Sequence, residues 1–239
     1  MGGQPAHPAP VFISGRRCRV SKQLRIDFVS DVSCPWCAIG LKSLEQAIER
    51  VAPDVTVDLH FQPFELNPDM GPEGQDIVEH ITEKYGAPLE QQIQSREQIR
   101  QRGEAVGFQF DMARRGRIYN TFDAHRLLHW AEEQGRQHAL KLALFEAYFT
   151  HCEDPSSREL LVRVAGQVGL DTAEAQRVLE SGEYADEVRE TEHFFQKAGI
   201  RSVPAIIINQ RHLISGGQPP EVFERALREI AAQGQEALG

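Results

Sequence analysis

The chain has 239 residues, enough for one large domain or for a domain that carries a sizeable insertion. Hydrophobic residues make up 41% and charged residues 26%, as in an ordinary soluble globular protein. The 26 basic and 35 acidic residues give a net charge of −9, which argues against nucleic acid or an anionic membrane surface as the main partner. No run of about 18 apolar residues occurs, so the sequence predicts no membrane-spanning segment.

Residues 1–21 are rich in proline, glycine and alanine, and we expect them to form a poorly ordered leader. The apolar run at residues 11–13 is too short for the core of a secretory signal, so we expect a cytoplasmic location. Cys18 lies in this leader and is interpreted as a free thiol. Four cysteines are too few for a disulfide scaffold in a chain of this length.

An apolar strand is expected at residues 24–29, and a helical pattern covers residues 38–50. Between them stands the motif Cys34-Pro35-Trp36-Cys37. Two thiols with this spacing at the start of a helix lie on one face, close enough to form a disulfide. Cys34 also faces the free N–H groups and the positive dipole end of the helix, which favours a thiolate. The strand, the motif and the helix together indicate a redox centre.

The four residues of the motif have distinct expected roles. We predict that Cys34 is an exposed attacking thiolate and that Cys37, one turn in and more buried, resolves the mixed disulfide. Pro35 occupies the first helical turn, where its missing N–H carries no penalty. Trp36 gives the rim of the site a flat apolar surface that can receive an unfolded or peptide-like substrate.

The middle of the chain has mainly the pattern of helices. Alternating side chains predict a second strand at residues 55–61, and the prolines and glycines at 63–72 indicate a loop. Residues 76–198 have a helical pattern, with a glycine-containing interruption at 103–116. Helix N-caps are expected at Asn120, Ser156 and Asp171.

After Gly199 the pattern returns to strands. A continuous apolar run at residues 205–208 predicts a buried strand, and residues 212–215 form its expected hairpin partner. A final helix is expected at residues 219–231. The sequence thus predicts an α/β fold in which two strand-containing units flank one long helical segment.

Val203-Pro204, directly before the apolar strand, is the expected docking element. A proline here removes a hydrogen-bond donor from the sheet and can hold a cis peptide bond in a tight bend. If this bond is cis and lies against Cys34, the backbone of Val203 can pair with an extended substrate strand. We therefore predict that Pro35, Trp36, Val203 and Pro204 bind substrate.

The motif Cys34-Pro35-Trp36-Cys37 after a strand, with Val203-Pro204-Ala205 far downstream and helices between, resembles the DsbA family of thioredoxin-fold proteins. The segments at 120–127 and 214–218 resemble the FrnE-like branch of that family. The resemblance covers about residues 24–231, which is nearly the whole chain. It implies disulfide exchange by Cys34 and Cys37 beside a cis Pro204.

The resemblance also implies a thioredoxin fold with a large inserted all-helical domain. Residues 22–62 plus 199–234 would form the thioredoxin-like domain, and residues 63–198 the insertion. Trp36 stands where the strongly oxidising DsbA enzymes carry His, so a less oxidising protein is expected. Many thioredoxin-fold enzymes have a buried acid on the strand before the motif, and Asp27 and Asp31 are both candidates, with no role assigned to either.

A structural metal half-site is the alternative interpretation of the two motif cysteines. A lone C-x-x-C without a second pair at zinc spacing is a weak metal signal, so we predict no metal site. His125 and His129 stand four residues apart on one helix, but without an H-E-x-x-H glutamate, and their apolar neighbours favour a packing role. That His125 faces Cys34 across a cleft is a weaker hypothesis.

The remaining candidates are interpreted as structural. Cys152 is taken as a small buried hydrophobic residue rather than a second thiol site. The run Arg114-Arg115-Gly116-Arg117 suggests an anion patch, but a short solvated turn is favoured in an acidic chain. Four aromatic residues are candidates for the lining of an apolar cleft, namely Trp36, Phe64, Phe122 and Phe149. For Phe149 we prefer ordinary core packing.

The resulting prediction is a cytoplasmic thiol–disulfide oxidoreductase, namely a protein disulfide oxidase, reductase or isomerase acting on protein or peptide thiols and disulfides. It requires no cofactor beyond the redox-active Cys34–Cys37 disulfide, with glutathione as a candidate reductant, and it has no nucleic-acid or membrane partner. One alternative is a glutathione-dependent small-molecule isomerase or kappa-class-like transferase, although such relatives typically carry Ser at the position of Cys34. The other is a non-catalytic holdase or binding module. We make no prediction of the oligomeric state.

Overall fold

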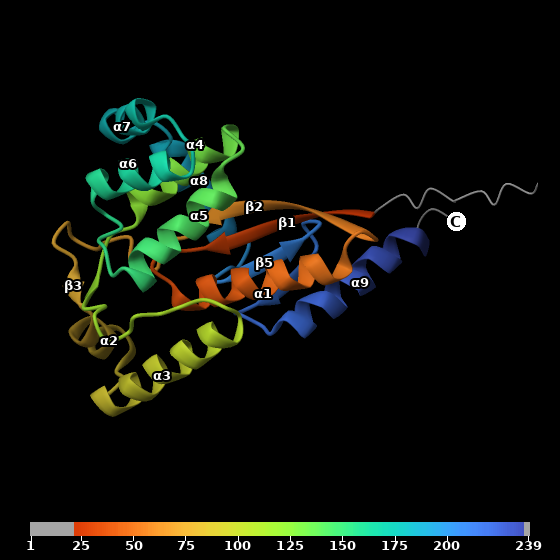
Figure 1. Ribbon diagram of the computed structural model, residues 1–239, viewed down its shortest axis with the longest axis horizontal. Coiled ribbons are helices and arrows are strands. Elements are labelled where there is room, and N and C mark those ends of the chain that lie inside the picture. Colours follow the sequence, from red (N-terminus) through yellow and green to blue (C-terminus); the bar gives the residue numbers. More distant parts are fainter. Residues whose placement is uncertain (1–21, 237–239) are drawn as a thin grey trace, which may run out of the picture.

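The computed structural model of the chain describes residues 22–236. The predicted leader, with Cys18, lies outside the described residues. A four-stranded sheet lies at the centre, with helices packed against it and a further group of helices beyond one edge (Figure 1). The predicted α/β class is confirmed, because helices surround a mixed sheet.

The central sheet has the strand order β2-β1-β5-β6. β1 pairs in parallel with β2, whereas β5 pairs antiparallel with both β1 and β6. The hairpin of β5 and β6 has the predicted bounds, while β2 continues two residues beyond its predicted end. The four strands are β1 (Lys22–Ser30), β2 (Val55–Pro63), β5 (Ala205–Ile208) and β6 (His212–Ser215).

The alternation of side chains along β1 defines the layers of the molecule. Ile26 and Phe28 are fully buried in a cluster with apolar side chains of α1 (Pro35–Val51) and α9 (Pro220–Glu236). These two helices lie side by side in Figure 1. Val29 points to the opposite face, where it packs with Phe195 of α8 (Ala185–Lys197). The sheet is therefore a middle layer between two layers of helix.

The segment between β2 and β5 is mainly helical, as predicted. It also contains a two-stranded ribbon that the sequence analysis does not predict, because each of its strands is only two residues long. The elements of the segment are β3 (Gln75–Asp76), α2 (Ile77–Tyr85), α3 (Leu89–Ala105), β4 (Arg117–Ile118), α4 (Phe122–Glu133), α5 (Gln137–Phe145), the π-helical turn η1 (Glu146–Thr150), α6 (Arg158–Gln167), α7 (Thr172–Ser181) and α8.

The sequence predicts N-caps for three of these helices, and two of the observed cap positions are shifted by one residue. Asp171 caps α7 as predicted. The cap of α6 is Ser157 and not Ser156, whose hydroxyl instead binds a carboxylate of the preceding turn. At α4 the side chain of Asn120 accepts a hydrogen bond from the first helical N–H, but the cap position falls on Thr121.

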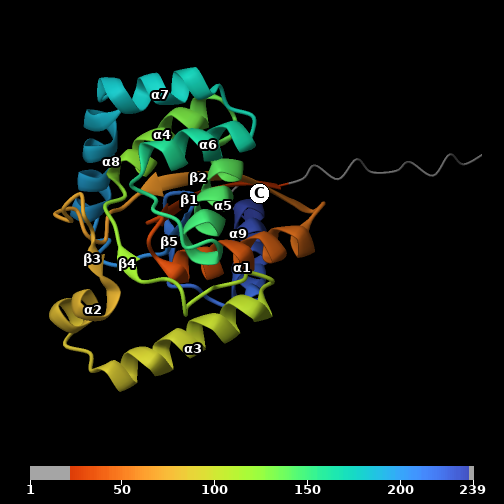
Figure 2. The same cartoon turned by 60° about the vertical axis from the view of Figure 1, so that its left-hand side comes forward.

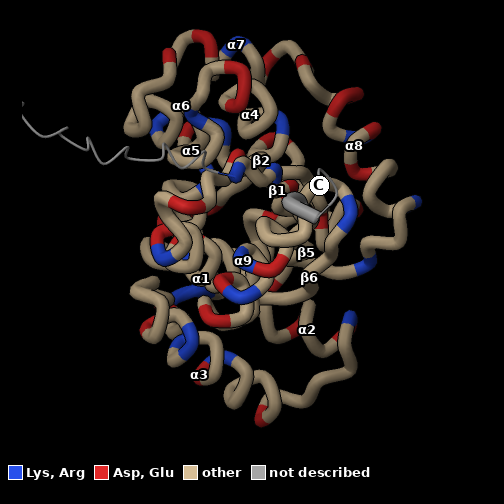
Figure 3. The backbone as a smooth tube through the Cα atoms, turned by 90° about the vertical axis from the view of Figure 1, so that its right-hand side faces the viewer, with Lys and Arg blue, Asp and Glu red and all other residues tan. Residues whose placement is uncertain are grey.

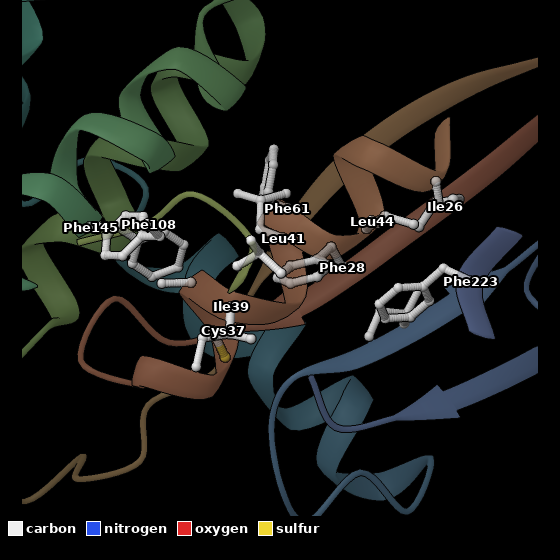
Figure 4. Close-up of a cluster of buried hydrophobic side chains, with 14 of the residues drawn as sticks. Ile26, Phe28, Cys37, Ile39, Leu41, Leu44, Phe61, Phe108, Phe145 and Phe223 are labelled. Carbon is white, nitrogen blue, oxygen red and sulfur yellow. The ribbon is translucent and has the colours of Figure 1, made fainter. Parts of the chain in front are cut away.

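Besides the cluster that contains Val29 and Phe195, two clusters of buried apolar side chains include residues of the helical segment. One lies among α4, α5, α6 and α7. The other reaches into the core of the sheet, where Phe108 and Phe145 belong to the same cluster as Cys37 and Ile39 of α1 (Figure 4). Aromatic side chains from residues 63–198 thus complete the core next to the motif, and the predicted domain division at residues 62 and 198 stays a prediction.

The N-terminal end of α1 is flanked by the helical segment. In Figure 2, α3 lies on one side of α1, and α4, α6 and α7 lie on the other. Acidic and basic positions are interspersed along the surface helices, α3 and α9 among them (Figure 3). No helix within residues 22–236 has both the length and the apolar character needed to cross a bilayer.

Candidate active site

The motif forms the first turn of α1. Cys34 is the N-cap, with φ −92° and ψ 112°, and Pro35 is the first helical residue. Pro35 therefore stands in the first helical turn, as predicted, because a proline at this place has the required φ and needs no hydrogen-bond partner. The N–H of Cys37 donates to the carbonyl of Cys34 at 3.0 Å, which places both free thiols in one turn.

Cys34 is much less exposed than predicted. Only 4% of its surface is accessible, and Cys37 is fully buried. The predicted order of burial is correct, but the expectation of an openly exposed Cys34 is wrong. A cleft of about 750 Å³ leads to Cys34, with walls from the chain after β2, from α2 and α3, and from the loop at 201–203. Because the helical segment covers the thiol, a reacting sulfur must enter this cleft.

The Val203–Pro204 peptide bond is cis, as predicted. The thiol of Cys34 donates a hydrogen bond to the carbonyl of Val203, with 3.7 Å between the sulfur and the oxygen. A Cβ on Gly40 of α1 would lie 3.1 Å from the Pro204 ring, and one on Gly217 would lie 2.8 Å from a main-chain oxygen of the motif. The two glycines therefore allow the loops on either side of the β5–β6 hairpin to pack onto the start of α1.

Pro35 and Trp36 are half-buried and line the cleft beside Cys34. The guanidinium of Arg102 lies 5.9 Å from the centre of the Trp36 ring, and it donates to the carbonyl of Gly217 at 3.0 Å. This cation–π contact fixes one face of the indole. The side chain of Trp36 is therefore fixed in the wall of the cleft and is not a freely exposed group at its rim.

The other aromatic candidates and Cys152 have separate positions. Phe64 lines the cleft, whereas Phe149 is fully buried in the core, as preferred. Phe122 does not belong to the lining of the cleft and packs its ring under Arg189, at 3.9 Å. Cys152 is half-buried, not fully buried, and its thiol donates to a main-chain carbonyl at 3.4 Å. Of these four candidates, only Phe64 contributes to the site.

Asp31 is a fully buried acid three residues before Cys34. Its carboxylate accepts hydrogen bonds from the N–H and hydroxyl of Ser33 (3.0 and 2.9 Å) and from the N–H of Leu66 (2.7 Å), and Nε2 of His125 lies 3.6 Å from Oδ1. Burial raises the pKa of Asp31, but the His125 ring and the N–H donors outweigh it and lower the pKa to about 2. Asp31 therefore ties the loop before Cys34 to the chain that leaves β2.

Replacing Asp31 by Asn should lower the free energy of unfolding at pH 7 by about 2 to 3 kcal/mol. The new amide nitrogen would face N–H donors, which leaves them without an acceptor. The folded pKa of about 2 lies below the ordinary 3.8, so the carboxylate stabilises the fold above about pH 4, and this contribution is lost as the pH falls to about 2. Urea unfolding at pH 7 and at about pH 2.5 should show the difference from wild type shrinking in acid.

Asp27→Asn is the matched control for this experiment. Asp27 is also buried, but its carboxylate is paired with the half-exposed Arg25 and with Gln62 on the strand surface. We expect Asp27→Asn to lower the free energy of unfolding by less than about 1 kcal/mol, as for other partly solvated ion pairs. Equal losses in both variants would contradict the assigned role of Asp31.

Lys141 of α5 is a buried cation behind the motif that the sequence analysis does not single out. It is 1% exposed, and its charge acts on Cys37, Asp31 and Cys34. Burial lowers the pKa of Lys141 to about 8, against the attraction of these three groups. Burial, and then the neighbouring Cys34, raise the pKa of the Cys37 thiol, while Lys141 lowers it. A lysine inside an otherwise apolar stretch of helix is the sequence signal that identifies it.

His125 does not line the Cys34 cleft, so the weaker hypothesis that it faces Cys34 is wrong. It is buried, faces Asp31, and lines a separate cavity of about 50 Å³ together with Lys141. The ring of His129 packs on Tyr184, with 5.0 Å between the ring centres, as its packing interpretation requires. Residues 22–236 contain no cluster of three or more His, Cys, Asp or Glu side chains that could hold a metal ion.

The run Arg114-Arg115-Gly116-Arg117 is only partly the solvated turn that the sequence predicts. Arg114 and Arg117 are exposed, and Arg114 pairs with Asp111. Arg115 points inward, is only 6% exposed and lines the Cys34 cleft. The prediction of a solvated turn is therefore wrong for Arg115.

Comparison with known proteins places this site in a family. The model of the DSBA-like thioredoxin domain matches residues 25–228. The protein YwbO of Bacillus subtilis is 28% identical over 207 residues, which cover 86% of this chain and 96% of YwbO. A probable DsbA oxidoreductase from Streptomyces coelicolor is 33% identical, with a TM-score of 0.79 over 86% of this chain and 89% of that one.

The fold extends to more distant structures. The cytosolic disulfide reductase DsbM from Pseudomonas aeruginosa, solved with GSH, has a TM-score of 0.61 at 14% identity, over 86% of this chain and 98% of that one. The match to the domain model includes the motif after β1 and the Val203–Pro204 bond before β5, and it confirms both the predicted thioredoxin fold and the resemblance to DsbA. The chain therefore belongs to the family of DSBA-like thioredoxin domains.

Proposed function

We propose that the chain catalyses thiol–disulfide exchange, with Cys34 as the attacking sulfur and Cys37 as the resolving sulfur. The observation that carries the proposal is the position of Cys34, which caps α1 at the cleft and lies 3.7 Å from the Val203 carbonyl. The unpartnered N–H groups of a first helical turn stabilise a thiolate at such a position. A probable DsbA oxidoreductase among the relatives supports the same chemistry.

In the reducing direction, the Cys34 thiolate attacks one sulfur of a substrate disulfide. A mixed disulfide forms, and the first substrate sulfur leaves as a thiolate. Cys37 then loses its proton and attacks the Cys34 sulfur, which forms the Cys34–Cys37 disulfide and releases the second substrate sulfur. The substrate gains two electrons and the protein loses them. The same steps in reverse oxidise a dithiol.

The substrate enters beside the loop at 201–203. Val203 and Pro204 lie next to Cys34, where an extended peptide can add its backbone to that of Val203. The 4% exposure of Cys34 favours an extended segment or a small disulfide over the surface of a folded protein.

We place the chain in the FrnE-like branch and in the cytoplasm, with glutathione as the thiol that reduces the Cys34–Cys37 disulfide. The likeness to DsbM, a cytosolic disulfide reductase solved with GSH, is compatible with this choice.

Trapping of the intermediate tests this proposal. In Cys37→Ser the resolving step is removed, so we expect reduced protein mixed with a disulfide-bonded peptide to accumulate a covalent adduct at Cys34 in about stoichiometric amount. Mass spectrometry of the adduct, with and without dithiothreitol, locates the bond. An adduct at Cys152 instead of Cys34, or none at either residue, would rule out the assigned order of attack.

A further inference from the structure

Two arginines in the wall of the Cys34 cleft lack an acceptor for part of their guanidinium groups. Arg115 comes from the loop before β4, and its Nη2 donates to the hydroxyl of Tyr148 (2.9 Å) and to the carbonyl of Ser33 (3.4 Å). Its Nε is fully buried and has no hydrogen-bond partner among residues 22–236. The guanidinium also lies over the rings of Tyr148 and Phe149, 4.7 and 5.0 Å from their centres, so its Nε–H group is buried without an acceptor in the described part of the chain.

Arg96 of α3 is the second of these arginines. Its Nε and Nη2 are buried, and neither has a partner within the described chain. Arg96 lines both the Cys34 cleft and a hollow between α3 and residues 109–113. The nearby carboxylates of that hollow are already paired, because Glu97 and Glu104 contact Arg100, and Asp111 contacts Arg114.

The wall of the cleft is positive although the whole chain is acidic. Lys84 and Arg201 also line it, while Glu65 is its one acidic residue in the part of the chain that the structure describes. Glu65 contacts Arg189, and burial together with Glu192 raises the pKa of Glu65 to about 7. Only Oε2 of Glu65 contacts Arg189, while its Oε1 is buried without a partner among the described residues, and neither oxygen pairs with Arg96 or Arg115.

A buried guanidinium N–H group without an acceptor needs an explanation, because buried polar groups in native proteins are almost always hydrogen-bonded. An arginine side chain keeps its positive charge when it is buried. A carboxylate is the acceptor that matches its planar set of N–H groups best. Both arginines line the cleft that leads to Cys34, and their unpartnered nitrogens are buried in its wall.

We propose that Arg96 and Arg115 bind a carboxylate of the substrate, so that the preferred substrate is an anionic thiol or disulfide. This inference rests on the proposed exchange at Cys34 and adds a substrate class to it. The carboxylate could belong to a small disulfide such as oxidised glutathione or to an acidic side chain of a peptide. The recognition chemistry is the same for both.

A charge series of small disulfides tests the inference. Dithiodipropionate carries carboxylates, hydroxyethyl disulfide is uncharged, and cystamine carries ammonium groups. The second-order rate constant for oxidation of the reduced protein is measured by timed alkylation and mass spectrometry. We expect wild type to react fastest with dithiodipropionate. Arg96→Gln should slow that reaction about tenfold, the effect of losing one charge-assisted hydrogen bond, and change the reaction with hydroxyethyl disulfide less than twofold.

Arg163→Gln is the matched control, since Arg163 is an exposed arginine of α6 that pairs with Glu153 and does not line the cleft. It should leave the charge preference unchanged, and Arg96→Lys should retain part of it. Arg115→Lys should weaken the preference without removing it, because a lysine keeps the charge but not the planar set of donors. Equal effects of Arg96→Gln on all three disulfides would overturn the inference and leave the exchange chemistry intact.

Two further comparisons complete the test. If Arg96→Gln slows the reaction with oxidised glutathione but not with its tetraethyl ester, in which every carboxylate is blocked, the carboxylates of a small disulfide are recognised. A loss confined to acidic peptide disulfides assigns the site to peptides. A wild-type protein that reacts with none of the disulfides would refute the proposed function. The anion site would then be tested by calorimetry with S-methylglutathione, whose binding requires no disulfide exchange. Absence of binding would overturn the proposed anion site as well.

Discussion

Replacing Cys34 by Ser should abolish disulfide exchange and slow the reduction of insulin at least about a thousandfold. A serine hydroxyl stays protonated at neutral pH and cannot form the mixed disulfide through which exchange proceeds. The fold should persist, because the Cys34 thiol makes one hydrogen bond, to the Val203 carbonyl, that a hydroxyl can also make. We expect the free energy of unfolding to change by less than about 1 kcal/mol, so the lost activity is chemical and not structural.

Cys152→Ser is the control for this substitution, because Cys152 lies outside the cleft and should leave the rate unchanged. The same variants separate the other two classes of function. Glutathione-dependent isomerisation or conjugation that survives Cys34→Ser would favour a small-molecule enzyme. Suppression of aggregation that survives replacement of both Cys34 and Cys37 would favour a holdase.

Local signals explain why the sequence predicts the sheet, α1 and the docking loop. The apolar run of β1, Pro35 at the start of α1 and the uninterrupted apolar strand β5 each fix a structure over fewer than about ten residues. The resemblance to a known family supplied what these signals cannot, namely that Val203–Pro204 meets Cys34 across 169 positions of sequence. The position of the motif and its docking loop could therefore be predicted together.

The rest of the site depends on contacts that no local pattern encodes. Asp31 owes its lowered pKa to Leu66 and His125, which lie 35 and 94 positions away in the chain. Arg115 stands in a basic run that has the composition of a surface turn, yet it folds inward against Tyr148. Cys34 becomes buried only when α2 and α3 pack beside α1 and form walls of the cleft. Burial at each of these points is a property of tertiary packing, and the charge pattern gives no sign of it.

Lys141 combines two effects of burial that have opposite consequences for stability and for chemistry. Its pKa in the folded protein is about 8, below the ordinary 10.5, because burial disfavours the ammonium ion. Such a group destabilises the fold below about pH 8, and the penalty disappears as the pH rises from about 8 to about 10.5. In its protonated form the same group is the neighbour that lowers the pKa of the Cys37 thiol, so it favours the proton loss that the resolving step requires.

Lys141→Met should therefore stabilise the protein at pH 7 by about 1 to 3 kcal/mol and yet slow the resolving step about tenfold or more. Methionine fills the same buried space without a charge to desolvate, and urea unfolding should show its advantage vanishing above about pH 10. The slow step should appear as a mixed disulfide at Cys34 that persists in the variant. Lys42→Met, which removes a partly exposed lysine paired with Glu45 on α1, should change neither quantity. A variant that is less stable at pH 7 and resolves at the wild-type rate would show that Lys141 is a structural partner of Asp31 and takes no part in the exchange.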